Sequence, residues 1–383
     1  MEKLYDKDAY MTEFSAKVED CFKRGGKFCV ILDKTAFFPT AGGQDCDTGT
    51  LSGRRVLCVD EENGTIVHCM KEPIPKGTGV TGKIDWDARF RKMQHHSAEH
   101  IISGLAHSML GLNNVGFHLS DKEVTMDYDG ELTEEEVNLL ESAANRVVQD
   151  NRKITAEYPS KEKLKTLEYR AKLDLTENVR IVTIDGTDIC ACCAPHVRNT
   201  GEIGMIKITD VMRHRRGVRM RMICGMDAYF DYCKKQTEVR KISALFSAKQ
   251  DEIASAAEQK LTEISQLKQK IGALSRAAAE QRAESISETD GNICIFEDDA
   301  DMNALRNIVN ICKKKCTGFA AVLSGNDKDG YNYIIASEKI PLRALSADMN
   351  NALSGRGGGR DDMLQGHFGA DKNTIKKYLA ELK

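Results

Sequence analysis

The stretch from Val239 to Ala278 limits the possible folds of this chain most strongly, because its composition differs from that of its surroundings. It contains no proline and one glycine, Gly272, and it is rich in Ala, Glu, Gln, Lys and Ser. A 3-4 or seven-residue spacing links Phe246, Ile253, Ala257, Lys260, Ile264, Leu267, Ile271, Leu274 and Ala278. This spacing predicts a heptad seam on a helix that would reach on the order of 60 Å. Such a rod is either a spacer packed in an intrachain hairpin or a dimer seam, and it divides the chain.

A chain of 383 residues is long enough for two or three domains around such a rod. Residues 1–90 are predicted to form a small β-barrel-like domain, since short strands such as Lys27–Leu32, Arg55–Val59 and Thr65–Cys69 alternate with turn signals. Residues 91–226 are predicted to form an α+β domain. Residues 227–288 form the helical or coiled-coil connector, and residues 289–383 a compact glycine-rich α/β domain. The predicted fold class is therefore α+β.

Within the α+β domain, a helix is expected from Trp86 to about Leu110. A second helix is expected after the cap-like Thr133 and a third near Lys161–Lys172. In the last domain, the segment GRGGGR at 355–360 is interpreted as a glycine-rich loop before a final helix, Lys372–Leu382.

Charge and hydropathy exclude several classes of protein. The formal net charge of −3 excludes nucleic-acid binding by bulk positive charge, although a local basic patch remains possible. No apolar run approaches the roughly 18 residues of a membrane-spanning helix, so no membrane partner is expected. The charged start MEKLYDKDAY does not resemble a secretory signal, and the 13 cysteines are an odd number. We therefore expect a cytoplasmic protein with reduced thiols, some of them metal ligands.

Two pairs of residues have the spacing of metal ligands. His96 and His100 stand four apart in the predicted helix, which places both imidazoles on one face. Cys192 and His196 form a second pair, and together the four make a Cys-His₃ set suited to Zn²⁺. The alternative is that the histidines only pack or cap the helix. A zincin protease is disfavoured, because Ser97 follows the first histidine where that motif needs glutamate.

Neighbouring residues leave the ligand set partly open. Cys190 and Cys193 could also ligate the metal, and otherwise they are local packing thiols. His95 directly precedes His96 and could exchange roles with it, although only His96 keeps the four-residue spacing to His100.

Four segments in a fixed order resemble the alanyl-tRNA editing proteins, the free-standing AlaX group related to the editing half of alanyl-tRNA synthetase. They are LDKTAFFPTAGGQDCDTGTL, HHSAEHIISGL, GFHLSDKEVTMDYDG and CCAPHVRNTGEIGMIKI, which together span about residues 30–225. HHSAEH is similar to the family's HTxxH, and CCAPHV to its CGGTHV, with both glycines and the threonine replaced. The tail GRGGGRDDMLQGHFG resembles the end of the C-terminal domain of the synthetase, a domain also attached to DHH phosphoesterases. Long AlaX proteins join an editing core, a helical connector and this glycine-rich domain.

The resemblance implies an ATP-independent trans-editing hydrolase that serves translation quality control. Its substrate would be tRNA(Ala) mischarged with serine or glycine, and a zinc ion held by His96, His100, Cys192 and His196 would assist hydrolysis of the ester. Gln44 and Thr35 are the catalytic candidates, since an amide and a hydroxyl can hydrogen-bond a water, a serine hydroxyl or the terminal adenosine. Without the family, turn chemistry would explain both residues. The alternative function is a tRNA-binding module with a structural zinc.

Two other enzyme classes fit less well. The editing signatures begin within about forty residues of the first residue, which leaves no room before them for an aminoacylating domain, so a synthetase is not expected. A DHH phosphodiesterase is suggested only by the tail, and no DHH triplet occurs in the chain.

Two arginine groups are predicted to contact tRNA. The segment MRHRRGVRMRM supplies Arg213, Arg215, Arg216 and Arg219. These arginines could form a phosphate-binding edge, or they could simply lie on the solvent-exposed face of a strand. In the tail, Arg356, Gly358 and Arg360 could approach an RNA backbone. A homodimer through the connector or the C-terminal domain is also possible.

Overall fold

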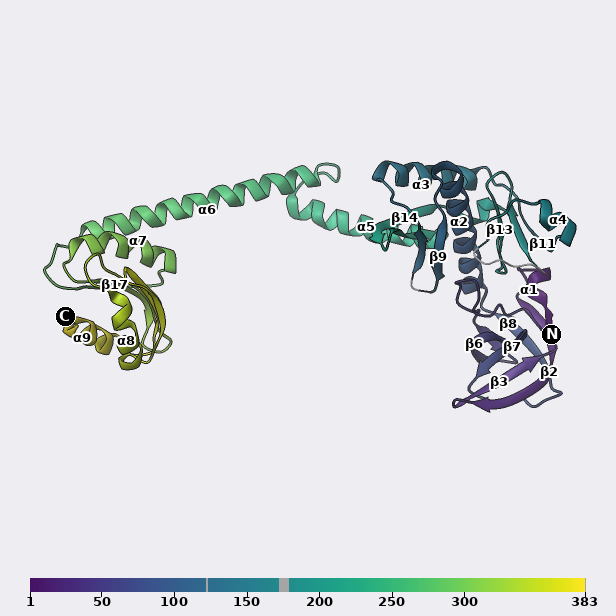
Figure 1. Cartoon of the computed structure of the whole chain (residues 1–383), viewed down its shortest axis with the longest axis horizontal. Helices are drawn as coiled ribbons and strands as arrows, with labels where there is room; N and C mark the ends of the chain where they lie inside the picture. The colour runs from purple at the N-terminus through teal and green to yellow at the C-terminus, as the bar shows by residue number, and fades with distance from the viewer. Residues whose placement is uncertain (122, 172–178, 383) are drawn as a thin grey trace. The chain divides into compact units, whose positions relative to one another are not determined.

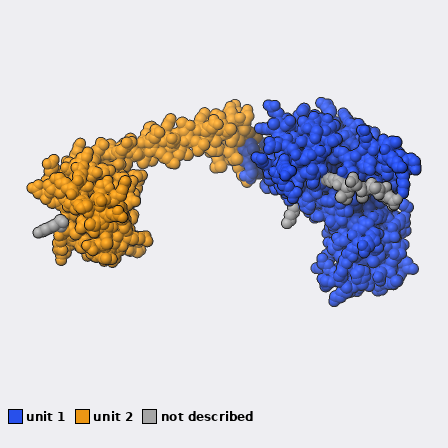
Figure 2. Space-filling model, viewed as in Figure 1, with its two compact units in different colours: residues 1–239 blue, residues 240–383 orange. Residues whose placement is uncertain are grey.

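The computed structural model describes residues 1–121, 123–171 and 179–382, and its sheets and helices confirm the predicted α+β class. The chain divides into two compact units, residues 1–239 and 240–383 (Figures 1 and 2). Among the described residues, none of the helices combines the length and the apolar character needed to cross a bilayer.

The first unit begins with a closed barrel. Its strands pair in the order β2 (Glu13–Arg24), β3 (Lys27–Leu32), β7 (Thr65–Met70), β6 (Arg54–Glu62), β5 (Gly49–Leu51) and β8 (Gly79–Ile84), and β8 returns to β2. Alternate side chains of β2 point inward, as the period of a strand requires, so that Phe14, Ala16 and Val18 are buried. They join Val30 and Val59 in the apolar interior.

The long helix α2 (Trp86–Leu110) follows the barrel and carries His96 and His100. Beside it lie a sheet with the order β14–β15–β10–β9 (Ile206–His214, Gly217–Cys224, Val124–Tyr128, Asn114–Leu119) and a second sheet, β11–β12–β13 (Ile154–Glu157, Ile181–Ile184, Asp188–Ala191). Gly104 lets α2 approach the β12–β13 turn closely, because a Cβ there would lie 2.7 Å from Thr187 O and 2.8 Å from Asp188 Cβ.

Two shorter helices of this unit were expected from the sequence. Helix α3 (Glu134–Gln149) begins with the capping box predicted at Thr133: its side chain accepts from Glu136 N–H, and the Glu136 carboxylate accepts from Thr133 N–H. Helix α4 (Lys161–Thr166) lies within the third predicted helix, of which Lys172 falls outside the described residues.

The predicted continuous rod is wrong, because the segment forms two helices, α5 (Gly225–Phe246) and α6 (Ile253–Glu284). The break follows from Ser247, whose φ of 50° is left-handed, and from Ser243, whose hydroxyl and carbonyl both bond Ala248. Only the seam residues from Ile253 onward therefore share a helix. Along α6 the apolar side chains of Leu267, Ile271 and Leu274 are not buried by the rest of the second unit.

The second unit contains one sheet with helices on both faces (Figure 1). Its strand order is β16 (Ile293–Glu297), β17 (Ala320–Asn326), β18 (Gly330–Ala336), β20 (Met363–Phe368) and β19 (Gly355–Arg360). Helix α7 (Met302–Cys312) and the end of α6 cover one face, and α8 (Ser346–Ala352) and α9 (Lys372–Glu381) contribute to the core of the other.

The glycine-rich segment 355–360 is not a loop, as predicted, but the edge strand β19 paired with β20. Gly357 lies opposite Gly366, and a Cβ at Gly357 would lie 2.4 Å from the hydroxyl oxygen of Tyr333. The glycines are therefore compatible with a strand because they leave room for a neighbouring ring.

Candidate metal centre

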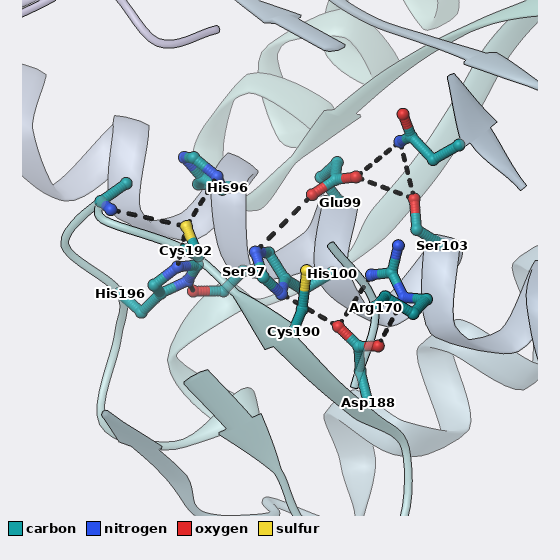
Figure 3. A network of polar contacts seen from close by, with 12 residues as sticks. His96, Ser97, Glu99, His100, Ser103, Arg170, Asp188, Cys190, Cys192 and His196 are labelled. Atoms are coloured by element: carbon teal, nitrogen blue, oxygen red, sulfur yellow. Dashed lines mark hydrogen bonds and ion pairs between the residues drawn. The ribbon is translucent and has the colours of Figure 1, made fainter. Parts of the chain in front are cut away.

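Four predicted ligands meet at one point although they come from distant parts of the chain (Figure 3). His96 and His100 lie one turn apart on α2, and Cys192 and His196 lie in the segment that follows β13. Their ligand atoms are all within 4.8 Å of one another, and all four side chains are buried or half-buried. Arg180 holds the segment in place by donating to Cys192 O at 3.0 Å and Ala194 O at 2.8 Å.

Each imidazole has a second partner on its Nδ1 atom. His96 Nδ1 lies 2.8 Å from Gln44 Oε1, His100 Nδ1 lies 3.0 Å from Asp188 Oδ2, and His196 Nδ1 lies 3.0 Å from Ser97 Oγ. An amide oxygen and a carboxylate can only accept, so Gln44 and Asp188 keep the protons of His96 and His100 on Nδ1. This leaves Nε2 as the metal-facing atom, and the Nε2 atoms of His96 and His196 lie 3.5 and 3.4 Å from Cys192 Sγ.

The electrostatics of the centre suit a dication. Burial opposes ionisation of Cys192, but the neighbouring imidazoles hold the pKa of its thiol well below the usual value, and Ala194 N–H donates to its sulfur at 3.4 Å. Burial lowers the pKa of His196 to about 3, so this imidazole is neutral, as a ligand must be. Burial also acts to lower the pKa of His100, but Asp188 and Cys192 outweigh it and raise that pKa well above the usual value, so His100 must release a proton when a metal binds. Three imidazole nitrogens and one thiolate, with a partner behind each ring, are a donor set that fits tetrahedral zinc.

Asp188 orients His100 and is itself held by Arg170, which donates to its two carboxylate oxygens at 2.7 and 2.8 Å. Burial would raise the pKa of Asp188, yet the hydrogen bonds from His100 and Arg170 outweigh it and keep that pKa below its ordinary value. Asp188 therefore carries a full negative charge toward the His100 ring.

The competing ligands suggested by the sequence fall outside the group of four. His95 uses both ring nitrogens, since Nδ1 bonds Arg91 O at 2.8 Å and Nε2 accepts from Cys224 N–H at 3.2 Å. Cys190 groups with His100 and Asp188, not with the other three ligands. Cys193 is exposed, and its sulfur lies 3.5 Å from the position of a Cβ at Gly42.

The two catalytic candidates have different surroundings. Gln44 is buried against His96, and among the described residues its Nε2 has no hydrogen-bond partner. Thr35 is also buried, but its hydroxyl lies 2.9 Å from His68 Nε2 and accepts from Phe37 N–H at 3.1 Å. Gln44 thus supports the ligands directly, whereas the hydroxyl of Thr35 is occupied within the barrel.

Sequence reasoning missed the supporting roles of Ser97, Asp188, Arg170 and Glu99. Glu99 is buried; its Oε1 accepts from Ser103 Oγ at 2.8 Å and Asn114 Nδ2 at 2.6 Å, and its Oε2 lies 3.8 Å from His100 Nε2. The HHSAEH segment was the one local signal for these supporting residues, because it places several polar side chains at buried positions of α2. Asp188 and Arg170 gave no signal, because their roles depend on the approach of β13 to α2.

Two clefts border the centre. One of about 310 Å³ reaches His196 and is also lined by Tyr10, Arg180 and Arg198. The other, of about 620 Å³, is lined by Asp188, Arg170 and other residues that include none of the four ligands.

The predicted tRNA contacts lie in both units. Arg213, Arg215 and Arg216 are exposed near the tip of the β14–β15 hairpin, and Arg213 lies 3.8 Å from Glu131. Arg219 instead donates to both carboxylate oxygens of Asp127, at 2.7 and 2.8 Å. Arg356, Gly358 and Arg360 lie on β19, at the edge of the sheet in the second unit.

Comparison with known proteins gives three family matches in chain order. The model of class II (A) tRNA synthetases matches residues 5–88, the second additional domain of threonyl and alanyl tRNA synthetase matches 179–220, and the DHHA1 domain matches 290–383. The alanine--tRNA ligase of Pyrococcus abyssi is 29% identical over 389 residues, which cover 95% of this chain and 42% of that protein. The alanine--tRNA ligase of Ignicoccus hospitalis is 30% identical over 299 residues, 75% of this chain and 32% of that protein.

The chain is an AlaX-like relative of alanyl-tRNA synthetase.

This AlaX-like chain spans less than half the length of the ligases that it matches. Among solved structures, the C-Ala domain of Aquifex aeolicus alanyl-tRNA synthetase matches at 21% identity with a TM-score of 0.21, covering 24% of this chain and 94% of that one. Cys192 and His196 lie inside the segment matched by the second additional domain, whereas His96 and His100 lie outside the three matched segments.

Proposed function

We propose that the chain is a trans-editing hydrolase, which cleaves the ester between serine or glycine and tRNA(Ala) with the help of zinc. The observation that carries the proposal is the buried Cys-His₃ centre, in which a separate partner holds each imidazole with its Nε2 toward Cys192. The relation to alanyl-tRNA synthetase points to the substrate, since an aminoacyl ester on tRNA(Ala) belongs to that chemistry.

The chain's own residues have definite tasks in this reaction. A zinc ion in the centre would supply a Lewis acid for the ester and its water. Gln44 orients His96 through Oε1, and its unpaired Nε2–H can donate to the ester carbonyl or to the serine hydroxyl. A site that bonds the hydroxyl of serine would discriminate against alanine, whose methyl group would leave the polar partner unsatisfied. Thr35 would have to release His68 before it could contribute.

Glu99 is the candidate for holding a proton in the reaction. Its Oε2 lies 3.8 Å from His100 Nε2, while its other oxygen is fixed by Ser103 and Asn114. A carboxylate held in this way could accept the proton of the attacking water and return it to the departing ribose oxygen.

One observation favours a second function. The protein supplies four ligands, and a complete set of four is typical of structural zinc. The alternative is therefore a tRNA-binding module whose zinc has no part in chemistry.

The partner in both cases would be tRNA, bound in part by the exposed arginines of the β14–β15 hairpin and by β19. Arg219 would position the hairpin through Asp127 and contribute less to the contact. We also propose a homodimer that forms through α6, whose seam residues Ile264, Leu267, Ile271 and Leu274 are exposed.

The decisive experiment follows release of labelled serine from seryl-tRNA(Ala), with alanyl-tRNA(Ala) in parallel. We expect rapid loss of serine, retention of alanine, and loss of activity in His100→Ala and Gln44→Ala. If neither ester is cleaved although the protein binds zinc and tRNA, the hydrolase is excluded and the binding module takes its place.

A further inference from the structure

A row of three cysteines crosses the outer face of the barrel, away from the centre on α2. Cys69 on β7 lies directly opposite Cys29 on β3 and Cys58 on β6. Residues directly opposite each other in a sheet project from the same face. The three thiols therefore lie side by side, in a cluster with Ile31 and Val67 that is separate from the barrel interior.

A carboxylate meets two of these thiols. Asp60 is two residues after Cys58 on β6, so its side chain leaves the strand on the same face. The sulfur atoms of Cys58 and Cys69 and a carboxylate oxygen of Asp60 all lie within 4.8 Å of one another. Bonds of about 2.3 Å to sulfur and about 2.0 Å to oxygen place tetrahedral ligand atoms roughly 3.6–3.8 Å apart, so shifts of about 1 Å would close the set.

The cluster is half-buried, and burial with the neighbouring Cys69 and Asp60 raises the pKa of Cys58 to about 12, so a bound metal would have to displace its thiol proton. Cys69 is only 5% exposed, whereas Cys58 and Asp60 are half-buried, which leaves a side open to solvent for a fourth ligand. Arg24, held by two hydrogen bonds to Glu62, is close enough that Cys29 and Cys69 add to the increase in its pKa. A nearby guanidinium favours thiolates once a metal has displaced their protons.

We propose that Cys58, Cys69 and Asp60 form a second metal site, for a thiophilic dication such as Zn²⁺, on the outer face of the barrel. Two sulfur ligands and one oxygen ligand leave the fourth tetrahedral position to water. Binding displaces both thiol protons, and affinity therefore rises with pH. The site is independent of the hydrolysis proposed at His96 and His100.

A disulfide between Cys58 and Cys69 is the competing fate of these thiols, because opposite residues on antiparallel strands are close enough for one. A disulfide uses two sulfur atoms and has no need of a carboxylate. The convergence of Asp60 on the same point favours a cation.

The test is a Cd²⁺ titration of the full-length protein after removal of metals and reduction, followed by the absorption of thiolate-bound cadmium. We expect two equivalents per chain in the wild type, one with two thiolates and one with Cys192 alone. Cys58→Ser should remove one equivalent and about two thirds of the absorption, since two of three thiolates no longer bind. Cys21→Ser, a half-buried cysteine of the same barrel outside the cluster, should change neither value.

A second variant protects the test against misfolding. Asp60→Asn keeps both thiols, and we expect it to weaken Cd²⁺ binding at the barrel site only. The loss in affinity should be at least as large as the 10–100-fold that losing a supporting partner costs. The proposal is overturned if Cys58→Ser binds as much Cd²⁺ as the wild type, or if thiol counting before reduction finds Cys58 and Cys69 joined. If the centre on α2 binds no Cd²⁺, each protein binds one equivalent fewer, but Cys58→Ser still binds one equivalent fewer than the wild type.

Discussion

The state of each imidazole in the centre is determined by the residue behind it. One carboxylate oxygen of Asp188 accepts a hydrogen bond from His100, and both oxygens accept from Arg170. This single carboxylate therefore fixes the tautomer and the ring orientation of His100. Ser97 has the same task for His196, and it can perform it because it lies between the two histidines of α2.

At Asp188, we predict that Asp188→Asn lowers the zinc affinity by roughly 10–100-fold while the protein remains folded. The amide lacks the negative charge that holds His100. Its N–H₂ group also faces either His100 or Arg170, both of which are donors themselves. Competition with a chromogenic chelator measures the affinity. Asp185→Asn, at an exposed position of the same turn, is the control, and equal affinities in both variants would contradict the role of Asp188.

At His68, we predict a loss of stability at mildly acidic pH. Burial lowers the pKa of His68 to about 4, against about 6.5 in the unfolded chain. Between these values the unfolded chain binds a proton that the folded barrel excludes, so the free energy of unfolding falls as the pH decreases from about 6.5 to about 4. From pH 7 to pH 5 this amounts to roughly 1–2 kcal/mol.

The measurement is urea unfolding followed by the fluorescence of Trp86, the single tryptophan of the chain. His68→Gln retains polar groups for Thr35 and Val30 but cannot titrate, so its pH dependence should be shallower by that amount. The same slope in both proteins would show that His68 is protonated in the folded barrel.

At the scale of the element, the glycines of β19 show how a strand can look like a loop in sequence. Gly357 and Gly366 are cross-strand partners, and a Cβ at either would lie 2.4 or 2.8 Å from the hydroxyl oxygen of Tyr333. The ring stacks on Phe368 with centroids 3.9 Å apart, so the pair forms part of the core of the second unit.

For this strand, we predict that Gly357→Ala destabilises the second unit by about 1–3 kcal/mol, because the new methyl group meets the hydroxyl of Tyr333. Gly358→Ala is the matched control, since a Cβ there meets nothing within 4 Å. Thermal unfolding by circular dichroism compares the two. If Gly358→Ala keeps its stability and also its affinity for tRNA, Gly358 is not a point of close approach to RNA.

Helix α6 has an apolar seam that its own unit does not use. Ala279 and Ala283 pack into the second unit, whereas Ile264, Leu267, Ile271 and Leu274 are 48–70% exposed. In a parallel two-stranded coiled coil the heptad would place Glu263 of one chain beside Lys268 of the other, which is an attractive pair.

We therefore predict a concentration-dependent dimer, which sedimentation equilibrium would detect. Leu267→Glu puts two carboxylates into the seam and should shift the protein to the monomer. Gln266→Glu adds the same charge outside the seam and should leave the dimer unchanged. A monomeric wild type at high concentration would contradict the assignment.

At the scale of the whole molecule, the proposed tRNA binding would rely on local charge, because the chain has a net charge of −3. Exposed and paired arginines should then contribute unequally. Arg216 is exposed at the tip of the β14–β15 hairpin, while Arg219 is bound by two hydrogen bonds to Asp127.

We predict that Arg216→Gln weakens tRNA binding and reduces the slope of log K against log salt by about 1, because one phosphate contact is lost. Arg219→Gln should change that slope less, because its charge is already balanced by Asp127. Filter binding at several salt concentrations measures both. Equal slopes in the wild type and Arg216→Gln would place the phosphate contacts elsewhere on the chain.

The sequence was sufficient for features that depend on local spacing. The spacing of four positions from His96 to His100 put both on one helix face, the capping box at Thr133 started α3, and alternating strands produced the α+β class. The motifs were also sufficient for the relation to alanyl-tRNA synthetase, because the four segments keep their order and their key residue types although the residues between them differ.

Only the tertiary structure decided which neighbour of each motif takes part. It joined Asp188 to His100 across 88 residues, because Gly104 lets β13 approach α2, and it paired His95 with Cys224 and left Cys193 exposed. It also ended the rod at Phe246 and made a strand of GRGGGR, since Ser247 adopts a left-handed conformation and Tyr333 fills the space above the glycines. Contacts of this kind depend on distances between segments remote in the chain, and neither periodicity nor composition records those distances.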